Sequence, residues 1–300
     1  GMIWAPLIKL LSSVLCKEHR GLALFYISTT FYAGGLCTKG IAIYNFSQGS
    51  FRPIFKTSAL ILFVVFVIWV IVSIVSTKKL VYDEEQVQAE SQKGGKFKNK
   101  DFRKAVISSG LLLMVVPSLV KSMGDVGLKS WGATMIKSTY SLTESFATLL
   151  SLIVVLAGFS VPFVTRLIYK LTKSDEVKTS LYAFLLCVLP IIVLMEVGIV
   201  NKYIELVMLI IVTVLMNIIT QTLVIMGAAR FEKWGGAATA TGILNAAASV
   251  GVFLANYGFG LIAEFFGWKY IFVVLMALVL ISSVCLLIAV PKWKRFKAEI

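Results

Sequence analysis

The sequence predicts an all-α, multi-pass transmembrane helical bundle, and three observations carry that prediction. First, 58% of the 300 residues are apolar and only 15% are charged, whereas soluble proteins contain about 45–50% apolar and about 25% charged residues. Second, the mean hydropathy of +0.90 comes from long apolar runs, each near the ~20 residues that a helix needs to cross a bilayer. Third, the basic residues behind the net charge of +14 gather between those runs. These observations exclude a soluble globular protein and a nucleic-acid-binding module.

Two full spans are predicted before the middle of the chain, at residues 21–46 and 54–77. Both are long enough for a bilayer core of about 30 Å. Residues 2–16 are apolar as well, but they are too few for a comfortable crossing. Backbone groups in lipid must be hydrogen bonded within the chain, so each span is expected to be a helix.

The longest polar segment, residues 78–104, follows these two spans. It combines five acidic and eight basic residues with a Gly-Gly pair. Mixed-charge runs of this kind are typical of solvated connectors, and the charge would also suit an anionic lipid surface. We therefore interpret it as a central loop between residues 1–77 and residues 105–300.

Six further spans are predicted after the central loop. Aromatic residues are expected at membrane interfaces, and four tryptophans fall near predicted span ends: Trp131, Trp234, Trp268 and Trp293. The six apolar stretches are residues 104–127, 142–169, 179–200, 203–228, 236–262 and 268–290.

The distribution of Lys and Arg predicts the orientation of the chain in the membrane. Alternate connecting segments hold 21 of the 29 basic residues. The positive-inside rule places these segments, the central loop and the C-terminus in the cytoplasm. The segments are residues 9–20, 77–104, 166–178, 229–233 and 292–297.

No catalytic, metal-binding or cofactor-binding pattern is found. The four cysteines are scattered without a CxxC pair, and His19 is the single histidine. No GxxxxGK[ST] segment is present, which argues against ATP-driven transport. We expect no enzyme activity, no metal, no cofactor and no nucleic-acid partner.

Six spans after a long cytoplasmic loop form the pattern of one half of a major facilitator superfamily transporter, and several segments resemble that superfamily. KEHRGLA at residues 17–23 resembles the turn between its fourth and fifth spans, and the glycine pair Gly34–Gly35 follows. GDVGLKSWGATMI at 124–136 resembles the end of its seventh span, and residues 235–268 resemble its eleventh span with the turn into the twelfth. The segments are most similar to the organophosphate-carrier-like branch.

This resemblance implies alternating access and an N-terminal truncation. Residues 1–77 would then be the end of span four with spans five and six, and residues 105–300 the C-terminal six-helix half. Alternatively, the chain has a true start near its Gly-Met beginning. Asp125 stands where the branch has an arginine, and Phe31 stands where it has a histidine. The cytoplasmic turn expected between spans eight and nine keeps only its basic residues Arg166 and Lys170.

Ionisable residues within spans are costly and indicate function by default. Lys39 follows Ser28, Tyr32 and Gly35 on one helical stripe, and it either binds an anionic group or extends towards the interface. Lys121 lies four residues before Asp125. The two could neutralise each other, or protonation of Asp125 could free Lys121 to bind an anion. Lys129 and Lys137 are interpreted as cations of an outer loop.

Amide residues form two further polar stripes, one at Asn217 and Gln221 and one at Asn245. Amides can bind a polar solute through both donor and acceptor groups, but they also join transmembrane helices. Both readings stay open here. A separate set of glutamates near span ends is expected at the interface: Glu144, Glu196, Glu205 and Glu264.

Together these features predict a secondary active transporter for a small polar or anionic organic solute, located in the plasma (inner) membrane. We expect a proton or a counter-substrate to be coupled to transport of the solute. The protein would be surrounded by the lipid bilayer, and it would not need to form an oligomer. The alternatives are a non-transporting solute sensor on the same fold and a multidrug exporter. The predicted solute and ion pathway consists of Lys39, Lys121, Asp125, Asn217, Gln221 and Asn245.

Overall fold

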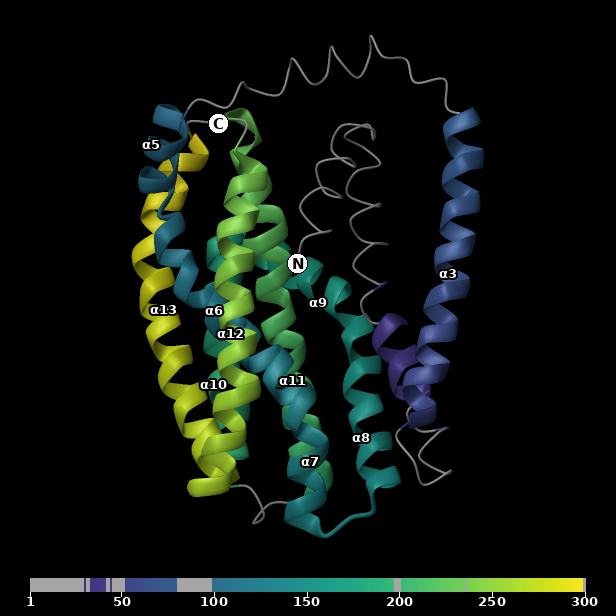
Figure 1. The fold of residues 1–300 in the computed structure, drawn as a ribbon. Helices are drawn as coiled ribbons and strands as arrows, with labels where there is room; N and C mark the ends of the chain where they lie inside the picture. Colours follow the sequence, from purple (N-terminus) through teal and green to yellow (C-terminus); the bar gives the residue numbers. More distant parts are fainter. Residues whose placement is uncertain are drawn as a thin grey trace. The chain divides into compact units, whose positions relative to one another are not determined.

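The structure is a computed structural model in which the described residues are helical apart from turns, with no strand among them (Figure 1). These residues form parts of two compact units, which meet in sequence at Lys93 and Gly94. Each unit is treated by itself below. The described residues are 30, 33–41, 44, 52–79, 99–196, 201–234 and 236–298.

The smaller unit contains helical residues 33–41 and the long helix α3 (Arg52–Lys79). Pro53 lies in the first turn of α3, where its missing N–H costs no hydrogen bond. The apolar residues Phe55–Val72 are not buried within the protein, as expected for a helix that faces lipid. Most of the predicted span 21–46, residues 2–16 and most of the central loop lie outside the described residues.

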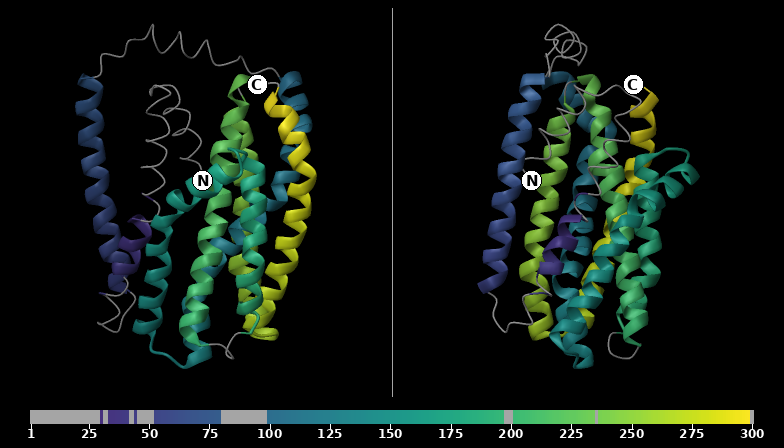
Figure 2. Two further views of the ribbon diagram at one scale, coloured as in Figure 1. Left: turned by 180° about the vertical axis from the view of Figure 1, so that it is seen from behind. Right: turned by 90° about the vertical axis from the view of Figure 1, so that its right-hand side faces the viewer.

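The larger unit is a bundle in which the long helices run side by side, while the short helix α9 lies at an angle to them (Figure 2). The α-helices are α5 (Asn99–Ser109), α6 (Val115–Ser122), α7 (Leu128–Tyr140), α8 (Glu144–Ala157), α9 (Val161–Leu171), α10 (Glu176–Leu194), α11 (Lys202–Ile219), α12 (Ala237–Phe265) and α13 (Trp268–Ala298). Short 3₁₀ segments are η1 (Leu111–Met114), η3 (Gly158–Ser160) and η5 (Arg230–Trp234). Two π-helical segments are η2 (Met123–Gly127) and η4 (Thr220–Gly227).

Seven helical stretches in the described residues are long and apolar enough to cross a membrane, and they correspond to the seven predicted spans from residue 54 onwards. This confirms the all-α multi-pass prediction for the described part of the chain. The stretches are Phe55–Val72, Leu111–Tyr140, Leu149–Leu171, Glu176–Leu194, Lys202–Lys233, Ala237–Phe265 and Trp268–Ala298.

The first span of the larger unit ends later than predicted. It was expected at residues 104–127, but η2 continues α6 directly into α7, so the helical stretch runs to Tyr140. The glycines of this region do not end the helix, because Gly127 has ordinary helical dihedral angles. Lys129 and Lys137 are therefore helical residues of α7, and their assignment to an outer loop was wrong.

Two other residues expected at the interface are buried instead. Trp293 and Glu205 are both 0% exposed. Glu205 lies in the first turn of α11, beside Tyr140, whose side chain hydrogen bonds it. The longer α7 thus covers a residue that would otherwise lie near the surface. Glu196 and Glu264 are exposed, and the side chain of Glu144 lies outside the described set.

Helix α12 approaches the α6–η2–α7 stretch very closely. A Cβ atom on Gly251 would lie 2.2 Å from the backbone oxygen of Leu119, and one on Gly127 would lie 2.5 Å from the Phe259 ring. The Ser118 hydroxyl donates a 2.8 Å hydrogen bond to the carbonyl of Leu244 across the same contact. Small residues that let two backbones approach are typical of helix packing in membranes.

The variant Gly251→Ala is therefore expected to destabilise the purified protein by about 1–3 kcal/mol, the usual cost of overpacking. The added methyl group meets backbone atoms of Leu119, which cannot rotate away. Gly258→Ala is the matched control, because its Cβ would enter open space on the same helix. Thermal unfolding in detergent measures both variants, and equal stability of the two would contradict the close contact.

Candidate functional site

Asp125 lies in the π-helical segment η2, within the bundle of the larger unit. π-Helical turns are rare and often occur at functional sites. The residue is 9% exposed. Its carboxylate forms an ion pair with Lys129 one turn later. The Asn217 side-chain amide from α11 donates a 2.6 Å hydrogen bond to Oδ1.

The Asn217 amide is held in place by its own helix as well. Its Nδ2 also donates to the backbone carbonyl of Thr213, at 2.9 Å. Asn217 lies three residues before the second π-helical segment, η4. Each of the two helices that meet at Asp125 therefore departs from regular α geometry close to the contact.

The ion pair differs from the predicted one. Sequence spacing suggested Lys121 and Asp125, but the carboxylate pairs with Lys129. An acidic residue four positions before a basic one is the more favourable order on a helix, which accounts for the preference. Lys121 is itself only 7% exposed, and it forms no ion pair with the residues that the structure describes.

Two other predicted pathway residues of the larger unit do not join this contact. Gln221 and Asn245 are partly buried, in η4 and α12 respectively, and no hydrogen bond within the described ranges joins either side chain to Asp125. Asn245 follows Leu244, whose carbonyl binds Ser118 of α6. Lys39 is a partly buried residue of the smaller unit, which is described by itself. Within the larger unit, the structure joins Asp125 and Asn217 by a hydrogen bond.

A small cavity of about 10 Å³ adjoins the cluster formed by Asp125, Lys129 and Asn217, which we call the Asp125 cluster. The cavity lies between α7, α8 and α11. Its lining includes the Lys129 side chain and two hydroxyl-bearing residues of the neighbouring helices. The lining residues are Leu128, Lys129, Gly132, Ala133, Ile136, Ser151, Val154, Leu209 and Thr213.

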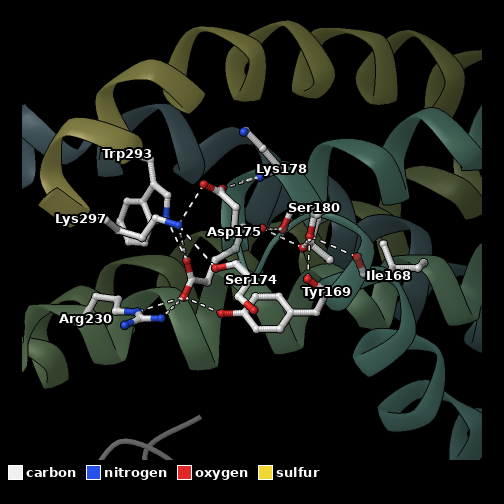
Figure 3. A network of polar contacts seen from close by, with 12 residues as sticks. Ile168, Tyr169, Ser174, Asp175, Lys178, Ser180, Arg230, Trp293 and Lys297 are labelled. Carbon is white, nitrogen blue, oxygen red and sulfur yellow. Dashed lines mark hydrogen bonds and ion pairs between the residues drawn. The ribbon is translucent and has the colours of Figure 1, made fainter.

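A second polar cluster surrounds Glu176 at the start of α10, and Figure 3 shows Tyr169, Arg230 and Trp293, which contribute to it. Glu176 is 0% exposed, and its Oε1 accepts hydrogen bonds from Arg230 Nε at 2.9 Å and Nη2 at 2.7 Å. The Tyr169 hydroxyl donates to the same oxygen at 3.0 Å, and the buried Trp293 indole N–H donates to Oε2 at 3.0 Å.

The neighbouring Asp175 completes this second cluster. Its Oδ1 accepts the backbone N–H of Lys178 at 3.0 Å and so caps α10, while Lys297 Nζ donates to its Oδ2 at 2.9 Å. The cluster joins the turn between α9 and α10 to η5 and to the end of α13. Its carboxylates are already occupied by donors, so it holds the helices together rather than binding a solute.

Sequence reasoning missed the Glu176 cluster. The SDE sequence before an apolar run is a helix-start signal, and it identifies the cap at Asp175. The donors to Glu176 could not be found in this way, because Arg230 and Trp293 lie 54 and 117 residues away in the chain.

Comparison with known protein families supports the sequence resemblance. The sequence model described as Major Facilitator Superfamily matches residues 1–239. The chain belongs to the major facilitator superfamily. Members of this superfamily are membrane transporters, so a small-molecule substrate and a lipid bilayer are the partners that membership implies. The comparison with curated proteins finds no match.

Membership in the major facilitator superfamily confirms the general resemblance stated from the sequence. The match is to the superfamily and not to a branch. The organophosphate-carrier-like assignment, the N-terminal truncation and the division at residues 77–78 and 104–105 stay predictions.

Proposed function

We propose that this superfamily member is a secondary active transporter that moves a small polar or anionic organic solute by alternating access. The observation that carries the proposal is the Asp125 cluster. Its carboxylate and ammonium groups lie among the helices of a bundle whose buried residues are mostly apolar, where charges are expensive and their retention indicates function.

The charges around Asp125 favour an anionic solute. Lys121 and Lys129 flank one carboxylate, and Lys121 is buried without an ion pair among the described residues. A buried cation without a counter-charge is unfavourable, and an anionic group on the solute would provide that charge.

Asp125 is the proposed coupling residue. Protonation would remove the counter-charge of Lys129, and a proton gradient could drive this change. A counter-substrate gradient is the alternative driving force for transport. The proposed pathway keeps the predicted residues Lys39, Gln221 and Asn245 in addition to the cluster. The proposed location is the plasma (inner) membrane with the central loop in the cytoplasm, because the basic residues follow the positive-inside rule.

Uptake by the full-length protein in proteoliposomes tests the proposal, with matched anionic and neutral analogues of one solute. We expect gradient-dependent uptake of the anionic analogue. Saturable binding without uptake would instead identify a solute sensor, and preference for an apolar drug would identify a multidrug exporter.

Lys121→Gln is expected to raise the anionic solute concentration for half-maximal uptake by about tenfold or more, since a hydrogen bond to a charged group contributes about 1.5–3 kcal/mol. Lys121→Arg keeps the charge and is the matched control. Uptake of the neutral analogue should change little in either variant. An unchanged concentration dependence in Lys121→Gln would remove this residue from solute binding.

A further inference from the structure

The small cavity beside the Asp125 cluster has a partly polar lining. Most of its lining is apolar, but Lys129, Ser151 and Thr213 also line it. Its volume of about 10 Å³ is near the lower limit for holding one water molecule. A water site also needs two to four polar partners, and the cavity has three candidate side chains.

Thr213 is the residue that needs a partner there. It is 1% exposed, and its hydroxyl has no hydrogen-bond partner among the described groups. Other buried helical threonines in this unit donate to the carbonyl four residues earlier, as Thr165 does to Val161 and Thr222 to Ile218. The Thr213 hydroxyl does not, although a buried hydroxyl is normally hydrogen bonded.

We propose that this cavity binds one ordered water molecule, which joins the Thr213 hydroxyl to the Lys129 ammonium and solvates that ammonium when Asp125 is protonated. The second half of the proposal rests on the proposed function of Asp125. The water accepts a hydrogen bond from Lys129 and exchanges one with Thr213. A bound inorganic anion is disfavoured, because Asp125 already neutralises Lys129.

The titration of Asp125 depends on the groups that face it. Lys121 and Lys129 lie on its own helical stretch, and α11 presents the uncharged Asn217. From α12, the residues packed against η2 are Ala255 and Phe259, which do not titrate. When Asp125 takes up a proton, Lys129 loses its counter-charge. A water held by Thr213 would then solvate the Lys129 ammonium and lower the free energy of the protonated state.

Radiolytic hydroxyl labelling with mass spectrometry tests the water site without any transport measurement. Radicals formed from a bound water oxidise the side chains beside it, so we expect labelling of Leu209 and Ile136, which are 2% and 1% exposed. Leu275, 0% exposed in α13, is the control and should stay unlabelled. Thr213→Val should abolish the labelling, and Thr213→Ser should retain it. Absence of labelling in the wild type, or full labelling in Thr213→Val, would overturn the water site.

The stability of Thr213→Val tests the water site independently, because a dry cavity and a water-filled cavity predict stability changes in opposite directions. If the cavity were dry, the change would remove an unsatisfied buried hydroxyl and leave the protein equally or more stable. If the water is bound, the change removes one of its partners, and the thermal midpoint should fall below that of Thr213→Ser. A midpoint equal to or above the wild type would count against the proposal.

The proposed role of this water in the protonation of Asp125 is tested by measuring solute exchange in proteoliposomes over a series of pH values. In Thr213→Val, the pH of half-maximal exchange should move to lower values, since the ammonium is less well solvated after Asp125 is protonated. Thr213→Ser should keep the wild-type profile. An unchanged profile in Thr213→Val with loss of labelling would overturn the role in protonation while leaving the water site intact. Absence of exchange in the wild type would instead contradict the proposed function.

Discussion

Asp125→Asn is expected to abolish accumulation of solute against a gradient while leaving solute exchange intact. Asparagine has the shape of a protonated aspartate and keeps an oxygen for the Asn217 amide, which lies 2.6 Å from Oδ1. A transporter locked in this state can still exchange solute, but it cannot use the energy of a proton gradient. Proteoliposome assays of uptake and counterflow on the same preparation measure the two quantities separately.

Paired variants separate coupling from a purely structural role of Asp125. If the carboxylate only neutralises Lys129, whose side chain is 25% exposed, then Asp125→Asn removes the counter-charge of a partly buried ammonium and lowers the stability of the protein. Folding yield and solute binding would both fall, and the additional change Lys129→Gln should restore them. The additional change Lys121→Gln is the matched control. It should not restore folding yield or solute binding, because Lys121 is not the ion-pair partner of Asp125. Wild-type accumulation in Asp125→Asn would exclude the residue from coupling.

Glu176→Ala is expected to lower the stability by about 1–3 kcal/mol, because it removes the acceptor of a buried donor and leaves that donor unsatisfied. Arg230 loses both of its hydrogen bonds to Oε1, and the indole N–H of Trp293, which is 0% exposed, loses its acceptor. Thermal or denaturant unfolding of the purified protein measures the change.

Glu196→Ala is the control for this prediction. Glu196 also forms an ion pair, with Lys269 at 3.4 Å, but the two side chains are 49% and 56% exposed. Exposed pairs contribute about 0–1 kcal/mol, so the control should unfold almost as the wild type does. In the variant Trp293→Phe the indole donor is absent, so adding Glu176→Ala should lower the free energy of unfolding by less than it does in the wild type. Additive losses would show that the two residues act independently.

The number and order of spans could be predicted because lipid imposes a length and an apolar composition on each helix. Their ends were predicted less well. The span was predicted to end at residue 127, yet η2 carries the helix on to Tyr140. A glycine weakens a helix by only about 1 kcal/mol, and packing of Gly127 against Phe259 and Ala255 offsets that cost.

The candidate site could be predicted in part because lipid favours apolar residues in a span, so polar residues there are easily noticed. The acidic residue and the amide were recognisable because both are unusual inside an apolar span. The choice between Lys121 and Lys129 was not decidable from spacing alone, since both lie four residues from Asp125. The meeting of Asp125 and Asn217 depends on the packing of helices 92 residues apart, which no local pattern encodes.

The π-helical segment η2 has a consequence for the tolerance of this span to changes in length. A π turn accommodates more residues than an α turn, so deletion of one residue within Met123–Gly127 would allow regular α geometry to form. Because the π turn holds one residue more than the α turn that would replace it, this deletion would leave the faces of α6 and α7 in nearly their present orientation. Lys129, Trp131 and Ile136 would keep their neighbours, whereas deletion of a residue from the regular part of the helix would turn all later residues by about 100°. The segment η2 is therefore where this span can lose a residue and keep the register of the helices around it.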